Sequence, residues 1–144
     1  MPATIEEAMQ YQAQILIEAF SSENSPIDGT QLNYSRHSLL LIDQILKDFY
    51  IKKAPLPDDL HFISSCYVFE TLRKIFGGRY LRGDAPNDFI LLIGEPDCEI
   101  LCFVMERIWE AAQNWENNLL TTYADMIEEQ LGNKTNAHLG ATPL

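Results

Sequence analysis

The chain has 144 residues and a net charge of −11, from 21 acidic and 10 basic residues. This length corresponds to one domain, and a composition of 47% hydrophobic and 22% charged residues is typical of a globular protein. A surface of this charge repels nucleic acids and anionic bilayers, so we expect neither as a partner. The longest apolar runs, such as residues 89–93, are also far too short to cross a bilayer.

The three cysteines predict a reducing environment. Cys66, Cys98 and Cys102 cannot all pair with one another, and each lies among apolar residues. Cys98 and Cys102 are one helical turn apart, but a tetrahedral metal site needs further ligands, and the histidines lie on other segments. The first residues lack the basic and apolar regions of a secretory signal, so we expect none. We therefore expect a cytoplasmic protein with no metal and no cofactor.

Two helices are predicted at the start of the chain. Thr4 and Glu7 have the spacing of a capping box, and apolar residues at helical intervals extend this first helix over residues 4–22. The second helix covers residues 35–51 and has one apolar stripe. Asp43 is assigned to the opposite, solvent-exposed side of this helix.

A central helix and a hairpin are predicted next. Residues 58–76 have apolar side chains on most sides of a helix, and a Gly-Gly pair ends it. Two short strands, at 79–82 and 89–93, flank a turn-rich loop, so a β-hairpin is expected at about residues 79–94.

The last part of the chain is predicted to be helical. Apolar residues keep helical spacing through residues 97–131, and three asparagines between 114 and 118 could divide this stretch into two helices, with an asparagine capping the second. Residues 132–144 are small and polar without a period, and we predict a disordered tail there. The sequence thus predicts one domain, residues 1–131, of the α+β class. It is predominantly helical, with four or five helices packed around one hairpin.

The motifs of common enzymes are missing from the sequence. It has no glycine-rich phosphate loop, no nucleophile elbow and no Cys-x-x-Cys pair. His61 and Cys66 are five residues apart on one predicted helix, so their side chains diverge by about 140° and cannot form a catalytic pair. We expect a protein that is not an enzyme.

Glu70 is the most informative polar residue, because it lies in the apolar part of the central helix. Tyr67, Glu70 and Arg73 are spaced so that their side chains can form a polar line on one helix face. A carboxylate in apolar surroundings needs a partner, and we expect an ion pair or hydrogen bond to the hairpin through Arg79 or Tyr80. The alternative is that these five residues form a binding or acid–base site.

The charges are distributed unevenly along the chain. Four of the ten basic residues lie within residues 73–82, whereas residues 97–131 carry eight acidic residues against Arg107 alone, a local charge of −7. This acidic helical region indicates a basic protein partner. Two solvated surfaces of opposite sign with internal ion pairs are the other explanation.

The block from residue 38 to residue 127 resembles a family of uncharacterised bacterial proteins, a domain of unknown function, and a Leu-x-x-x-Tyr element at residues 119–123 is its last matching stretch. The family pattern combines a Ser-Leu-x-x-Leu-Asp-like helix start, a Gly-x-Tyr-x-Gly-Glu helix and a Gly-Gly-x-aromatic strand. The matching stretches here are residues 38–43, 65–70 and 77–80, with Ser65 and Phe69 at the positions of the two helix glycines. The resemblance implies an α+β domain in which Tyr67, Glu70 and Tyr80 form one cluster, and it implies no activity.

Three functional hypotheses follow. The first is a non-catalytic interaction or adaptor protein, including an immunity-like inhibitor, whose acidic helical face binds a basic partner. The second is a small-ligand-binding or enzymatic domain with a pocket around Glu70, between the central helix and the hairpin. The third is a homodimer that buries apolar residues of the last helices across a two-fold axis.

Overall fold

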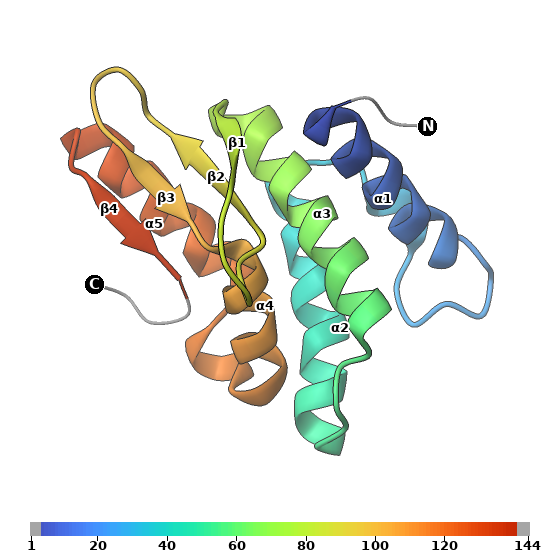
Figure 1. The fold of residues 1–144 in the computed structure, drawn as a ribbon. Helices are drawn as coiled ribbons and strands as arrows, with labels where there is room; N and C mark the ends of the chain where they lie inside the picture. Colours follow the sequence, from blue (N-terminus) through green and yellow to red (C-terminus); the bar gives the residue numbers. More distant parts are fainter. Residues whose placement is uncertain (1–3, 141–144) are drawn as a thin grey trace.

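Five α-helices and a four-stranded sheet make up residues 4–140, the part of the chain that the computed structural model describes (Figure 1). The helices are α1 (Ile5–Ala19), α2 (Leu39–Lys52), α3 (Asp58–Phe76), α4 (Val104–Gln113) and α5 (Leu120–Asn133). The strands are β1 (Arg79–Arg82), β2 (Phe89–Ile93), β3 (Ile100–Cys102) and β4 (Ala137–Leu139). Three single 3₁₀ turns, η1 (Gly29–Gln31), η2 (Arg36–Ser38) and η3 (Trp115–Asn117), lie in the connections. The predicted α+β class and helical predominance are confirmed.

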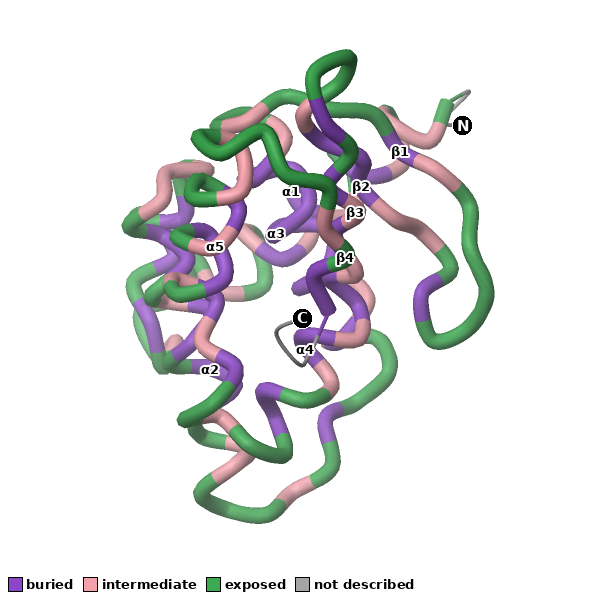
Figure 2. Tube along the Cα trace, turned by 90° about the vertical axis from the view of Figure 1, so that its left-hand side faces the viewer, coloured by how far each residue is buried: buried purple, intermediate pink, exposed green. Residues whose placement is uncertain are grey.

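Helix α3 is the centre of the fold, as its apolar residues on most sides predict. Every residue from Ser64 to Leu72 is buried (Figure 2). The sheet lies on one side of the molecule and α1 on the other, with α3 between them (Figure 1). Helix α1 packs along α3, and its first turn is capped as predicted, because the Glu7 amide donates to Thr4 Oγ1 at 3.1 Å.

The predicted hairpin is present, but it is one part of a larger sheet. The strand order is β1-β2-β3-β4, with antiparallel pairs β1–β2 and β2–β3 and a parallel pair β3–β4. Helices α3 and α4 pack against β2, and α5 packs against β3 and β4. None of the helices in residues 4–140 has the combined length and apolar character that would let it span a membrane.

The prediction of a helix from residue 97 is wrong for its first residues. Strand β3 occupies Ile100–Cys102, and α4 begins only at Val104. Ile100, Leu101 and Cys102 pair with the last three residues of β2. A short apolar run is compatible with a buried strand and with a buried helix. Here residues 100–102 form a strand because the free edge of β2 offers them hydrogen-bond partners.

The prediction of a disordered tail at 132–144 is also wrong within the described residues. Helix α5 continues to Asn133, and β4 then adds a fourth strand to the sheet. Leu139 is 3% exposed, and its carbonyl accepts a hydrogen bond from the Tyr123 hydroxyl. A strand of three residues is too short to show a period in the sequence. Its conformation is set by β3, whose edge supplies its hydrogen bonds. Residues 141–144 lie outside the described part.

A substitution at Leu139 measures how firmly β4 is attached. We expect Leu139→Ala to lower the free energy of unfolding by about 2–4 kcal/mol, because it leaves a cavity in the core beneath the sheet. His138, an exposed residue of the same strand, provides the control, and His138→Ala should have a much smaller effect. Urea unfolding followed by circular dichroism measures both. If neither variant changes the free energy of unfolding, Leu139 does not pack in the core, and the prediction of a disordered tail would be correct.

Candidate functional site

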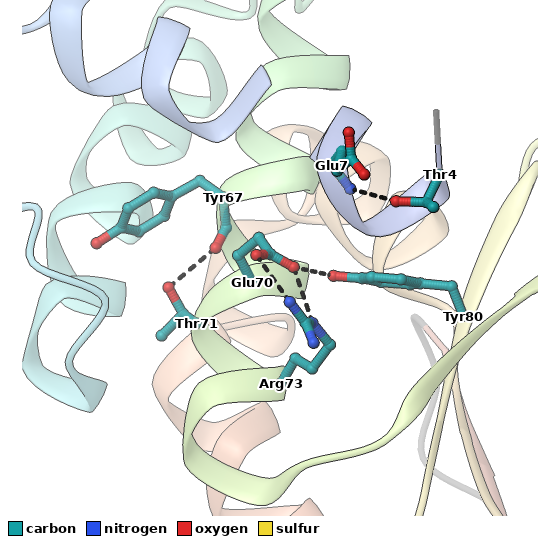
Figure 3. Close-up of polar contacts among 7 residues, drawn as sticks. All are labelled: Thr4, Glu7, Tyr67, Glu70, Thr71, Arg73 and Tyr80. Carbon is teal, nitrogen blue, oxygen red and sulfur yellow. Dashed lines mark hydrogen bonds and ion pairs between the residues drawn. The ribbon is translucent and has the colours of Figure 1, made fainter. Parts of the chain in front are cut away.

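The Glu70 carboxylate forms a closed polar cluster between α3 and β1. Its side chain is fully buried, and Oε2 accepts hydrogen bonds from Arg73 Nε at 3.0 Å and from the Tyr80 hydroxyl at 2.5 Å (Figure 3). Oε1 accepts a third from Arg73 Nη2 at 3.3 Å. The predicted link between the central helix and the hairpin therefore runs through Tyr80.

Two of the five predicted site residues lie outside this cluster. Tyr67 points away from Glu70 (Figure 3), and its hydroxyl donates to Ser38 Oγ at 2.7 Å and accepts from the Tyr34 amide at 3.0 Å. Arg79 forms an exposed ion pair with Glu95, with Nε 2.8 Å from Oε1. The predicted polar line of Tyr67, Glu70 and Arg73 is present only between Glu70 and Arg73.

The electrostatics of the cluster are those of a structural pair. Burial raises the pKa of Tyr80, so its hydroxyl remains a donor at neutral pH. The hydrogen bond to Glu70 raises the pKa of Arg73, so the guanidinium stays charged. Both carboxylate oxygens are already engaged within the protein. The cluster can fix β1 against α3, and its carboxylate is fully buried and so is not accessible to a ligand.

The surface hollow beside the hairpin does not reach Glu70. It has a volume of about 480 Å³ and is lined by Phe76, Gly77, Gly78, Arg79, Leu92, Gly94 and Glu95. It therefore contains the exposed Arg79–Glu95 pair and excludes the buried carboxylate. A ligand pocket around Glu70 gains no support from this geometry.

The buried cysteines and histidine have structural surroundings. Burial raises the pKa of Cys66 and of Cys102 to about 12, so both thiols are protonated at neutral pH. His61 donates from Nε2 to the Met105 carbonyl at 2.7 Å and stacks on Trp109 at 4.1 Å between ring centroids. Within residues 4–140, no group of three or more histidine, cysteine or acidic residues is placed to hold a metal ion.

Asp43 lies on the buried side of α2, so the prediction of a solvent-exposed position is wrong. It is fully buried, and its Oδ1 accepts from the Leu120 amide at 2.7 Å, while Oδ2 accepts from the Thr121 amide at 3.3 Å. Asp43 thus caps α5 from another helix, in place of the predicted asparagine. The signal was present, since Asp43 follows Leu39 by four residues, which puts both on one helix face.

Arg107 is the second buried charge that sequence reasoning missed. It is 1% exposed, and its guanidinium donates to the carbonyls of Asn118 at 3.1 Å, Leu119 at 2.8 Å and Gly140 at 3.4 Å. The same group lies over the Tyr123 ring, 4.9 Å from its centroid. Its position between Met105 and Ile108, on the apolar face of α4, is the sequence feature that indicates burial.

Comparisons with protein-family models, with curated proteins and with solved structures find no match to this chain. The resemblance to a domain of unknown function, drawn from residues 38–127, stays a prediction.

A pair of matched substitutions separates the buried cluster from the exposed ion pair. We expect Glu70→Gln to lower the free energy of unfolding by about 2 kcal/mol, because the variant loses the negative charge that pairs with Arg73 and places an amide nitrogen, a donor, against Arg73 Nη2. The same change at Glu95, in the exposed pair with Arg79, should leave stability close to that of the wild type. Chemical unfolding at neutral pH tests both variants. Equal losses would contradict a structural role that is specific to Glu70.

Asp43 should make stability depend on pH. Burial raises its pKa from 3.8 to about 6, against the opposing effect of the amide hydrogen bonds from Leu120 and Thr121. Between pH 3.8 and about pH 6 the folded state therefore binds more protons at Asp43 than the unfolded state does. As the pH rises across that range, the free energy of unfolding of the wild type falls by about 2–3 kcal/mol through this group. Asp43→Asn cannot ionise, so its stability relative to the wild type should increase by that amount between pH 4 and pH 7.

Urea unfolding of both proteins across this pH range measures the difference. The control is Asp48→Asn, which changes an exposed aspartate of the same helix. A difference between Asp43→Asn and the wild type that does not vary with pH would contradict the expected linkage.

Proposed function

We propose that this protein is a non-catalytic interaction protein, an adaptor or an immunity-like inhibitor, that binds a basic protein partner through the exposed face of α5. The observation that carries the proposal is the acidic character of that face. Asp125, Glu128 and Glu129 are exposed and follow one another at intervals of three and one residues, which places them on one side of the helix.

The carboxylates of α5 remain accessible although an arginine contacts two of them. Arg36 pairs with Asp125, and its Nη1 is 3.3 Å from Glu128 Oε2. The side chains of these two acids are still 71% and 67% exposed, and Arg36 is 35% exposed. Ion pairs of this kind are weak in water, so an arginine or lysine of a partner can compete with Arg36.

Burial of Arg107 leaves the surface of this region without a basic side chain of its own. Arg107 is the one basic residue of the segment 97–131, and its charge is directed to backbone carbonyls inside the protein. The surface of the segment therefore has no lysine or arginine of its own to balance its acids. A field of one sign steers a partner of the opposite sign and accelerates its association.

The cysteines support the proposed location. Cys66, Cys98 and Cys102 are buried and unpaired, as in proteins of a reducing compartment. We therefore propose a cytoplasmic location.

Neutralising the α5 face tests the proposal. The test variant is Asp125→Asn/Glu128→Gln/Glu129→Gln, and the control is Glu18→Gln/Glu23→Gln/Asp84→Asn, which removes the same charge from exposed residues elsewhere. Each immobilised protein is exposed to a lysate of its source organism at low and high salt, and bound proteins are identified by mass spectrometry. We expect a basic protein that the wild type and the control capture at low salt, and that the α5 variant loses.

Two results would contradict the proposal. One is a bound protein that the α5 variant retains as well as the control does. The other is capture that does not change with salt, because an interface that depends on exposed charges must weaken as they are screened.

A further inference from the structure

An apolar hollow lies between the carboxyl-terminal ends of α2 and α4, on a surface that the α5 proposal does not use. Its volume is about 720 Å³. It is lined by Tyr50, Ile51, Lys53, Ala54, Pro55, Ala112 and Gln113. Ile51 is 62% exposed and adds its apolar side chain to the surface of the hollow.

Lys53 lines this hollow, and charged residues of both signs lie close in sequence to its other lining residues. Lys52 and Lys53 are exposed at the end of α2. Glu110 and Glu116 are exposed and lie three residues before and after Gln113, which lines the hollow. Within residues 4–140, these two lysines and two glutamates form no ion pair.

We propose that this surface is the two-fold interface of a homodimer, in which each copy places Ile51 in the hollow of the other. A two-fold interface brings the same surface of both copies together, so the surface must complement itself. This one offers an exposed apolar side chain and an apolar hollow, together with unpaired cations and unpaired anions. Lys52 and Lys53 of each copy meet Glu110 and Glu116 of the other.

The overall charge limits where a second copy could associate. Two chains of net charge −11 repel each other over most orientations. The cations near the hairpin cannot offset this repulsion fully, because Arg73 is paired with Glu70 and Arg79 with Glu95. Lys52 and Lys53 lie next to apolar surface and have no carboxylate of their own chain, so they are available to the carboxylates of a second copy.

The first test is the mass of the full chain in solution. Sedimentation equilibrium from low micromolar to several hundred micromolar protein should show the average mass rising from that of a monomer to that of a dimer. Ile51→Glu should abolish the rise, because it puts a charge into the apolar contact. Leu40→Glu is the control, since Leu40 is an apolar residue of the same helix that is 42% exposed and lies away from the hollow, and it should leave the dimer intact.

Charge reversal then tests the pairing across the two-fold axis. Lys52→Glu/Lys53→Glu and Glu110→Lys/Glu116→Lys should each weaken self-association by about tenfold or more, because like charges then face one another. An equimolar mixture of the two variants should form a heterodimer, because the all-acidic margin then meets the all-basic one. Circular dichroism confirms that each variant is folded.

Three outcomes would overturn the proposal. A wild-type chain that stays monomeric at every concentration excludes the dimer and leaves the hollow to another ligand. A dimer that Ile51→Glu does not affect uses another surface, and equal loss in Ile51→Glu and Leu40→Glu shows association without a defined interface. Because Asp125, Glu128 and Glu129 are unchanged in all these variants, none of these results decides whether α5 binds a basic partner.

Discussion

The buried charges of Asp43 and Arg107 hold the second half of the chain in place. Asp43, on α2, accepts from the first amides of α5, and Arg107, on α4, donates to carbonyls of the connection between α4 and α5 and to Gly140 after β4. Helix ends and tight connections leave backbone groups without partners, and a buried group of this kind costs free energy. The two side chains supply those partners from outside the connection, so the connection needs no capping residue of its own.

This arrangement explains why polar side chains occupy the core at these positions. Two apolar residues of similar size could fill the same space and avoid the desolvation of two charges, which lowers the pKa of Arg107 and raises that of Asp43. They could not hydrogen bond to the backbone of residues 118–121 and 140. Those bonds can form only when α5 and β4 lie in one particular place relative to α2 and α4. The two charged side chains therefore restrict the packing of these elements more than apolar contacts would.

The sequence predicted those elements whose own residues determine them. Helices α1, α2 and α3 and the β1–β2 hairpin have periodic apolar residues, caps and turn residues within their own bounds. Strands β3 and β4 have three residues each, and their conformation is set by the edge that each one extends. The same distinction holds among the candidate site residues. Glu70 and Arg73 are neighbours on one helix and could be paired from the sequence, whereas the contacts of Tyr67 with Ser38 and of Arg79 with Glu95 depend on tertiary structure.

The internal pairing of charges determines what the net charge means for association. Most arginines of this chain are engaged within the protein, by Glu70, by Glu95, by the acids of α5 and by the carbonyls that Arg107 contacts. The sequence pattern of a basic hairpin therefore overstates the basic surface, because Arg73 and Arg79 are paired with carboxylates of the same chain. The two surfaces that we propose share no residue, so a dimer formed at the α2–α4 hollow would not use the α5 carboxylates. Both copies would then keep an acidic face for a basic partner, and self-association and partner binding need not compete.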